Sequence, residues 1–230
     1  LEIRASGMCG SDLKFYRPRG GAAALGLVGD GNPVIAGHEP CGVVAEVGSR
    51  VNSETAQVGG RVMVHHYLGC GECTHCVSGW SQLCLHGVTV YGATGHGSHA
   101  QFMKVAASTL VSLPDELSFS TGAAISCGTG TAFGALRRID LSSDDTIAIF
   151  GQGPVGLSAT QLASAMNARV IALDISPERL DRAKEFGAEE TLDPSKDDAV
   201  QAIRDLTRGE GADMALDCSS TPTARLASVQ

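Results

Sequence analysis

This chain of 230 residues lacks three features that would place it in large classes of protein. It has no run of lysine or arginine within a composition of 25 acidic and 17 basic residues, so a nucleic-acid partner is not expected. No apolar run approaches the roughly 20 residues that span a bilayer. No internal repeat has the period of a solenoid. These absences predict a soluble protein with no nucleic acid and no membrane as partner.

Four of the eight cysteines lie close together, at C-x2-C-x2-C-x7-C spacing. They are Cys70, Cys73, Cys76 and Cys84. One short loop can wrap four such thiolates around a single ion, and four thiolates saturate tetrahedral zinc, so a structural zinc site is predicted. A disulfide framework fits poorly with a chain of this length and 43% apolar content, and a redox C-x-x-C pair normally stands alone. Reduced, metal-binding thiols also predict a cytoplasmic location.

The pattern of expected secondary structure changes about halfway along the chain. The first half holds short β-type segments separated by glycine-rich turns, at 1–7, 41–48, 60–67 and 99–106. The second half alternates strand and helix, with strands at 146–150, 169–174 and 214–218 and helices at 155–166, 177–186 and 197–207. We therefore predict a mostly-β domain followed by an α/β domain. Leu1 lies in a strand and Gln230 in a helix, so both ends of the chain are expected to be cut.

The turn after strand 146–150 has the pattern G-x-G-x-x-G. Its residues are Gly151, Gln152, Gly153, Pro154, Val155 and Gly156. Between a strand and a helix these glycines permit a tight turn and the close approach of a pyrophosphate to the helix N-terminus. Asp174 ends the following strand, where a carboxylate binds ribose hydroxyls and repels a 2′-phosphate, which favours NAD over NADP. A phosphate-binding loop of an NTPase is disfavoured because Leu157 replaces its lysine; a turn that binds nothing remains the alternative.

Other residues able to bind zinc are scattered along the sequence. They are Cys9 in MCGSD, His38 and Glu39 in AGHEP, and Cys127 in AISCGTG. Each alone is typical of a core or a turn. Together they offer two cysteines and one histidine, a set that holds a catalytic zinc and leaves one position open.

These motifs, in this order, resemble the zinc-containing alcohol dehydrogenases of the medium-chain dehydrogenase/reductase superfamily. The resemblance rests on CGSD at 9–12, GHE at 37–39, the four-cysteine segment, Cys127 and GQGPVG. It implies a GroES-like catalytic domain at 1–122, with a structural zinc lobe at 69–85, and a Rossmann NAD-binding domain at 123–230. That domain would keep the first four strands of a doubly wound sheet ordered 3-2-1-4-5-6. It also implies two zinc ions per chain, hydride transfer between an alcohol or polyol and NAD to give an aldehyde or ketone, and a homo-oligomer.

The resemblance also assigns roles to individual residues. Cys9, His38 and Cys127 would bind the catalytic zinc, with Glu39 near the metal. Asp12 would hold the second nitrogen of His38, and Ser11 would accept the alcohol proton. Thr131 would lie near the nicotinamide and Arg179 near the adenosine ribose.

Several positions depart from the family pattern or carry no prediction of their own. Lys14 stands in place of a relay histidine, and Ser220 in place of a glycine. Cys127 stands where the polyol branch tends to use glutamate. Residues 17–31, expected to line part of the substrate pocket, have no readable pattern. Six histidines are expected at the surface or in turns rather than as ligands: His65, His66, His75, His86, His96 and His99.

The alternative to a dehydrogenase is a zinc-stabilised nucleotide-binding or interaction protein without that activity. The chain by itself, without the rest of the sheet, is expected to be inactive.

Overall fold

The computed structural model describes residues 1–16, 33–52, 54 and 56–230, so the loop at 17–31 lies outside the described residues. The chain forms two compact units, Leu1–Cys127 and Gly128–Gln230. The boundary lies later than the 122/123 position expected from the sequence, within the π-helix η4 (Ile125–Thr129). Helix α3 (Phe119–Ala124) continues directly into η4 and then into α4 (Gly130–Arg138). The boundary between the two units therefore falls inside a continuous helical segment, where the secondary structure does not change.

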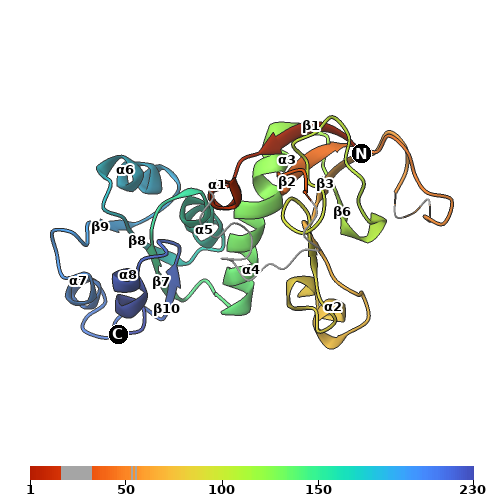
Figure 1. The fold of residues 1–230 in the computed structure, drawn as a ribbon. Helices are drawn as coiled ribbons and strands as arrows, with labels where there is room; N and C mark the ends of the chain where they lie inside the picture. Colours follow the sequence, from red (N-terminus) through yellow and green to blue (C-terminus); the bar gives the residue numbers. More distant parts are fainter. Residues whose placement is uncertain (17–32, 53, 55) are drawn as a thin grey trace. The chain divides into compact units, whose positions relative to one another are not determined.

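The first unit is built on an antiparallel sheet of four strands in the order β1-β2-β3-β6 (Figure 1). The strands are β1 (Glu2–Gly7), β2 (Glu39–Val43), β3 (Arg61–Val64) and β6 (Leu110–Ser112). Helix α3 packs against this sheet, where Ala123 joins Cys41 and Leu113 in a buried cluster. The short helix α1 (Gly10–Tyr16) follows β1, and the 3-10 helix η3 (Ala107–Thr109) precedes β6.

The prediction of a strand at 99–106 is wrong. This segment makes one isolated bridge, Glu2 with Phe102, and backbone hydrogen bonds to Leu1 and Ile3. At its two ends the backbone N–H groups bond elsewhere: His99 donates to the carbonyl of Ala36, and Ala106 donates to the hydroxyl of Tyr91. The segment is thus extended but cannot form a continuous ladder.

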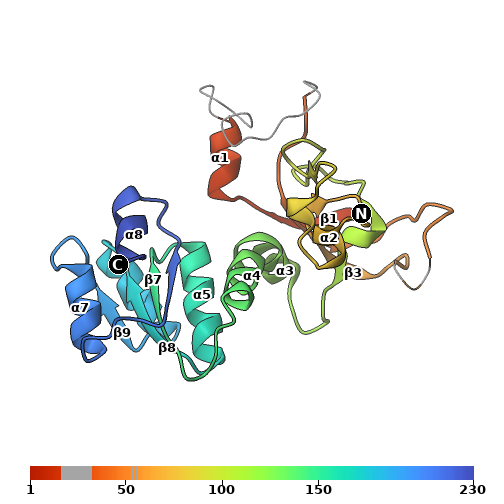
Figure 2. The ribbon, with the colours of Figure 1, turned by 90° about the horizontal axis from the view of Figure 1, so that it is seen from below.

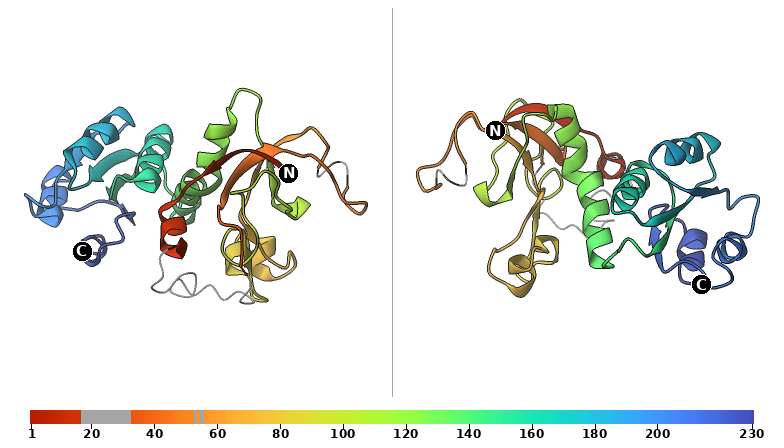
Figure 3. Two further views of the ribbon diagram at one scale, coloured as in Figure 1. Left: turned by 45° about the horizontal axis from the view of Figure 1, so that its top comes forward. Right: turned by 180° about the vertical axis from the view of Figure 1, so that it is seen from behind.

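The segment with four cysteines forms a small lobe that projects from the sheet, as both panels of Figure 3 show. The lobe contains helix α2 (Thr74–Val77) and the 3-10 helix η2 (Ser81–Leu83). A two-stranded ladder of β4 (Tyr67–Leu68) and β5 (Thr89–Val90) closes its base. A lobe with so little regular structure needs a cross-link to hold its shape.

The second unit contains a parallel sheet in the order β10-β7-β8-β9. Its strands are β7 (Thr146–Phe150), β8 (Arg169–Leu173), β9 (Glu190–Leu192) and β10 (Met214–Asp217). Counted along the chain this is 3-2-1-4, the order predicted for the first four strands of a doubly wound sheet. The sequence analysis missed β9, because an edge strand of three half-buried residues has too little hydrophobic pattern to be recognised.

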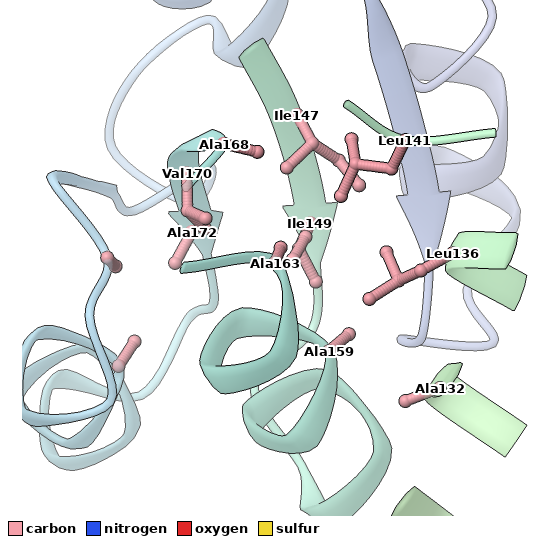
Figure 4. Close-up of a cluster of buried hydrophobic side chains, with 12 residues drawn as sticks. Ala132, Leu136, Leu141, Ile147, Ile149, Ala159, Ala163, Ala168, Val170 and Ala172 are labelled. Carbon is pink, nitrogen blue, oxygen red and sulfur yellow. The ribbon is translucent and has the colours of Figure 1, made fainter. Parts of the chain in front are cut away.

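Helices cover both faces of this sheet (Figure 2). Alternate residues of β7 point to opposite faces: Ile147 and Ile149 pack under α5 (Pro154–Ala165), whereas Ala148 and Phe150 pack with α7 (Ala199–Leu206) and α8 (Pro222–Ala227). Figure 4 shows the first of these clusters, where Ala159 and Ala163 let α5 approach the strands closely. Helix α6 (Pro177–Glu185) adds Ala183 to the same cluster. Among the residues that the structure describes, no helix is both long and apolar enough to cross a membrane.

Candidate functional site

The four cysteines of the lobe form one cluster. One sulfur atom from each of Cys70, Cys73, Cys76 and Cys84 lies within 4.8 Å of the others. Backbone N–H groups point at these sulfurs: Cys73 N lies 3.3 Å from Cys70 Sγ, and Cys70 N lies 3.3 Å from Cys84 Sγ. Such bonds favour thiolates, and donation from the backbone of Leu85 and Cys76 lowers the pKa of Cys73 to about 6. Four convergent sulfurs, with that of Cys73 readily ionised, suit a tetrahedral Zn²⁺ with no open position.

A second cluster brings together residues that are far apart in the sequence. Cys9 precedes α1, His38 and Glu39 lie at the start of β2, and Cys127 lies in η4. One ligand atom from each lies within 4.8 Å of the others. All four belong to the first unit, and His38 is buried. Sulfur, imidazole and carboxylate atoms in this arrangement can hold a zinc ion and leave a position for another ligand.

Asp12, on the first turn of α1, holds two members of this second cluster, His38 and Cys9, through hydrogen bonds. Its Oδ1 lies 3.0 Å from His38 Nδ1, and its Oδ2 accepts a hydrogen bond from the backbone N–H of Cys9 at 2.8 Å. With Nδ1–H directed at the carboxylate, His38 presents the lone pair of Nε2. Ser11 Oγ lies 3.4 Å from that Nε2. Asp12, only 6% exposed, thus fixes the positions of two of the potential ligands.

The charges in this cluster are strongly perturbed. Hydrogen bonds from Cys127 and His38 lower the pKa of Cys9 to about 3, while the hydrogen bond with Cys9 raises that of Cys127. Burial, followed by the charge on Cys9, raises the pKa of Glu39. Two thiols and a carboxyl that lie close together and compete for negative charge are the donor set that a divalent cation would neutralise. Gly7 makes room for this arrangement, because a Cβ there would overlap the Glu39 carboxylate.

Of the six histidines expected at the surface or in turns, His66 lies in the short connection between β3 and β4 but not at the surface. Its side chain is buried, with 6% of the residue exposed, and its ring centroid lies 5.0 Å from that of His38. Burial, with smaller contributions from His38 and His65, lowers the pKa of His66 to about 4. The sequence analysis treated HHY as the end of a strand, whereas His66 lies between β3 and β4, beside His38 of the second cluster. Burial alternates at Val62, Val64 and His66, so the period of β3 continues for two residues beyond the end of the strand.

The remaining residues with predicted roles in the first half are more exposed. Lys14 is exposed on α1. His86, His96 and His99 are exposed, and His65 and His75 are half-buried. The His65 ring lies 2.9 Å from Ser81 Oγ in η2, which ties the lobe to the chain that carries His66.

In the second unit, the glycine-rich turn joins β7 to α5. Gly151 has φ +90°, and a Cβ there would lie 2.7 Å from Ser219 N. A Cβ on Gly156 would overlap the carbonyl oxygen of Gly151, whereas a Cβ on Gly153 would meet open space. Pro154 occupies the first turn of α5, where its missing N–H costs nothing. The helix N-terminus and the open surface at Gly153 can receive an anion such as a pyrophosphate.

Asp174 lies at the end of β8 beside this turn. Its Oδ2 accepts a hydrogen bond from Gln152 N at 2.7 Å and its Oδ1 accepts one from Ser176 N at 2.9 Å. Arg179 Nη1 lies 3.5 Å from Oδ2, with its side chain 58% exposed. These bonds fix a buried negative charge next to the glycine turn. Thr131 is exposed on α4, and Ser220 has φ +60°, a conformation that suits the glycine that the family pattern has there.

The fold and these clusters define the class: a β domain with two groups of zinc-competent side chains, followed by an α/β domain of the dinucleotide-binding type. Comparison with known proteins agrees. Residues 1–115 match the model of the alcohol dehydrogenase GroES-like domain, and residues 154–230 match that of the zinc-binding dehydrogenases. The chain belongs to the zinc-containing alcohol dehydrogenases of the medium-chain dehydrogenase/reductase superfamily, which confirms the resemblance and the predicted fold class.

Individual relatives show how much of a longer protein the chain covers. It is 38% identical to an uncharacterized zinc-type alcohol dehydrogenase-like protein of Escherichia coli K12, over all of this chain and 65% of that protein. It is 34% identical to a sorbitol dehydrogenase of Bacillus subtilis 168, over 97% of this chain and 62% of that protein. An alcohol dehydrogenase from Thermus sp. ATN1 superposes with a TM-score of 0.86 at 29% identity, over all of this chain and 65% of that structure. The chain thus spans less than two thirds of the length of these relatives.

Proposed function

We propose that the protein of which this chain forms part is a zinc-dependent dehydrogenase that transfers a hydride between an alcohol or polyol and NAD, giving an aldehyde or ketone. The observation that carries this proposal is the cluster of Cys9, His38, Glu39 and Cys127, whose ligand atoms lie within 4.8 Å of one another. The family supports the reaction class, since relatives include an alcohol dehydrogenase and a sorbitol dehydrogenase.

Cys9, His38 and Cys127 would hold the catalytic zinc, and the four lobe cysteines a structural one, giving two ions per chain. A zinc ion with an open position supplies Lewis acidity, which lowers the pKa of an alcohol hydroxyl. The chain's own residues orient and carry protons around it. Asp12 holds His38 in one tautomer through Nδ1, Ser11 offers a hydroxyl 3.4 Å from Nε2, and Glu39 is a neighbouring carboxylate with a raised pKa. Lys14 is exposed, so we assign it no proton transfer.

NAD would bind at the glycine turn of the second unit. The open surface at Gly153 admits the pyrophosphate, and Pro154 and Val155 begin the helix whose N-terminus faces it. Asp174 would bind the adenosine ribose, with Arg179 beside it. We also propose, from the family resemblance, that Thr131 lies near the nicotinamide.

The direct test is a panel of alcohols and polyols assayed with NAD on the complete protein, together with its metal content. We expect NADH formation with some of these substrates and two zinc ions per chain. One tightly held ion and no hydride transfer would instead favour a zinc-stabilised nucleotide-binding or interaction protein.

Asp174 should set the preference for NAD over NADP. Replacing Asp174 with asparagine removes a buried negative charge that would repel the 2′-phosphate, so the ratio of kcat/KM for NAD to that for NADP should fall about tenfold. Asp181→Asn, which makes the same charge change at an exposed position on α6, is the matched control and should leave the ratio unchanged. A wild-type enzyme that prefers NADP would contradict this role.

Cys73 should be needed for the structural ion. Cys73→Ser replaces a thiolate with a hydroxyl that binds zinc poorly, so the metal content should fall from two ions to one. The midpoint of thermal unfolding should drop by about 5 °C or more, because metal binding stabilises the folded lobe. His75→Ala lies in the same lobe but outside the cluster and should retain both ions. Loss of metal in His75→Ala would mean that the ligand set is different.

Free thiols support the further proposal of a cytoplasmic location, since all eight cysteines are unpaired in the structure. The homo-oligomer stays a prediction from the family resemblance.

A further inference from the structure

The side chain of Gln152 is completely buried, although the residue lies in the glycine turn proposed for the cofactor. It is 0% exposed, as is Thr160 on α5. Its Nε2 donates a hydrogen bond to the carbonyl oxygen of Ile149 in β7 at 3.0 Å, and its Oε1 accepts one from Thr160 Oγ1 at 2.9 Å. A carbonyl oxygen only accepts, so the amide has one orientation and the Thr160 hydroxyl must donate. The side chain thus joins the turn to a strand and a helix.

Packing alone does not account for an amide at this place. Figure 4 shows Ile149 of β7 and Ala159 of α5 in the same apolar cluster. A leucine of similar size would fill the space between this strand and this helix without the cost of removing an amide from water. Hydrogen bonds are directional, however, and a fully paired buried network is rigid. What the amide adds is therefore a fixed position for the turn.

A rigid anchor matters here because the backbone around Gln152 is intrinsically flexible. The residue lies between Gly151 and Gly153, and glycine has more conformational freedom than any other residue. Within this G-x-G only Gln152 has a side chain, so only this residue can be held by side-chain bonds. Its backbone N–H donates to Asp174 Oδ2 at 2.7 Å. The same residue therefore also holds the carboxylate proposed for the adenosine ribose.

We propose that Gln152 and Thr160 form an internal tether that holds the glycine turn and Asp174 in the arrangement that binds the dinucleotide, before the dinucleotide arrives. The ribose and the pyrophosphate belong to one molecule, so the surface at Gly153 and the carboxylate of Asp174 must keep a fixed separation to bind both. Pre-organisation raises affinity because less ordering is left for the binding step. Gln152 and Thr160 are positioning residues, since their buried side chains act through the turn. This inference rests on the proposed function and deepens its cofactor site.

The test measures the binding of ADP-ribose, which contains the adenosine ribose and the pyrophosphate but no nicotinamide, to the complete protein by calorimetry. Thr160→Val has the same shape but no hydroxyl, so Oε1 of Gln152 loses its donor and the Kd should rise about tenfold. Thr160→Ser keeps the hydroxyl and should bind nearly as tightly as the wild type. Ile147→Val, the control, removes a methyl group from the neighbouring core and should lower stability without changing the Kd.

Two further measurements separate positioning from stability. In Thr160→Val the KM for NAD should rise with little change in kcat, because saturating NAD itself holds the turn in the bound arrangement. Gln152→Leu combined with Thr160→Val replaces both partners with apolar groups of similar shape. This double variant should recover the midpoint of thermal unfolding lost in Thr160→Val but not the affinity for ADP-ribose.

Equal Kd values for the wild type and Thr160→Val would overturn the tether and leave the proposed cofactor site intact. Recovery of the affinity in the double variant would also overturn it, because stability alone would then explain the loss. If the wild type itself did not bind ADP-ribose, the proposed cofactor site would be wrong and this inference with it. Absence of alcohol oxidation, with the expected pattern of Kd values, would contradict the proposed reaction but not the tether.

Discussion

Replacing Cys9 with alanine should remove one zinc ion per chain and lower kcat/KM for alcohol oxidation by about a thousandfold or more. Cys9 supplies one of the sulfurs in the cluster with His38, Glu39 and Cys127. Its loss leaves too few ligands to hold a catalytic zinc, whose Lewis acidity contributes several kcal/mol to such a reaction. Metal analysis and steady-state kinetics on the complete protein measure both effects.

Cys41→Ala is the matched control for this experiment. It deletes the same thiol from a buried position that packs with Leu113 and Ala123, outside both clusters. It should keep both ions and its activity, with a modest loss of stability from the small cavity. The Cys9 variant should keep its fold, because the hydrogen bond between His38 Nδ1 and Asp12 remains. The ligands proposed for the ion of the lobe are also unchanged. Full activity in Cys9→Ala would refute the assignment of the catalytic site.

The second large effect concerns the glycine turn, where two similar substitutions should differ strongly in their cost to stability. In Gly156→Ala the new Cβ overlaps the carbonyl oxygen of Gly151, which is rigid backbone, so α5 must move away from β7. We expect a loss of about 3 kcal/mol or more in the free energy of unfolding, measured by denaturant titration. The core under α5 is lined with alanines and is closely packed, so it cannot accommodate such a shift without losing contacts.

Gly153→Ala provides the comparison. Its Cβ would meet no atom within 4 Å, and the residue has an ordinary φ of −76°. The stability cost should be at most about 1 kcal/mol, since glycine is only moderately better than alanine at a helix N-cap. NAD should nevertheless bind less tightly, because the methyl group occupies the surface proposed for the pyrophosphate. Equal stability of the two variants would contradict the close packing at Gly156, and unchanged NAD affinity in Gly153→Ala would argue against this cofactor site.

Local patterns allowed much of the fold to be predicted from the sequence. The strand at 146–150, the glycine turn and helix α5 were recognised because their signals lie within one short segment. The errors have a common cause. The segment 99–106 has the alternation of a strand, but its backbone bonds are divided among β1, Ala36 and Tyr91. Strand β9 is too short to show a period and forms only because β8 offers it an edge. Both depend on partners distant in the sequence.

The candidate sites divide in the same way. The four lobe cysteines lie within fifteen residues, Cys70 to Cys84, so their spacing alone indicated that they would converge. Cys9, His38 and Cys127 were grouped through their ligand chemistry and a family resemblance, since chain spacing says nothing about whether such distant residues meet. The buried position of His66 had no motif to indicate it.

By itself the sequence determined the division into a mostly-β half and an α/β half, the cysteine lobe and the glycine turn. Each of these features depends on residues that are neighbours along the backbone. Only the tertiary structure decided that η4 and the segments next to β1, β2 and β3 bring together Cys9, His38, His66 and Cys127. It also decided which glycine is essential for packing and which faces open space. The physical reason is that burial, hydrogen-bond partners and close approach arise from contacts between distant segments, which exist only once the chain has folded.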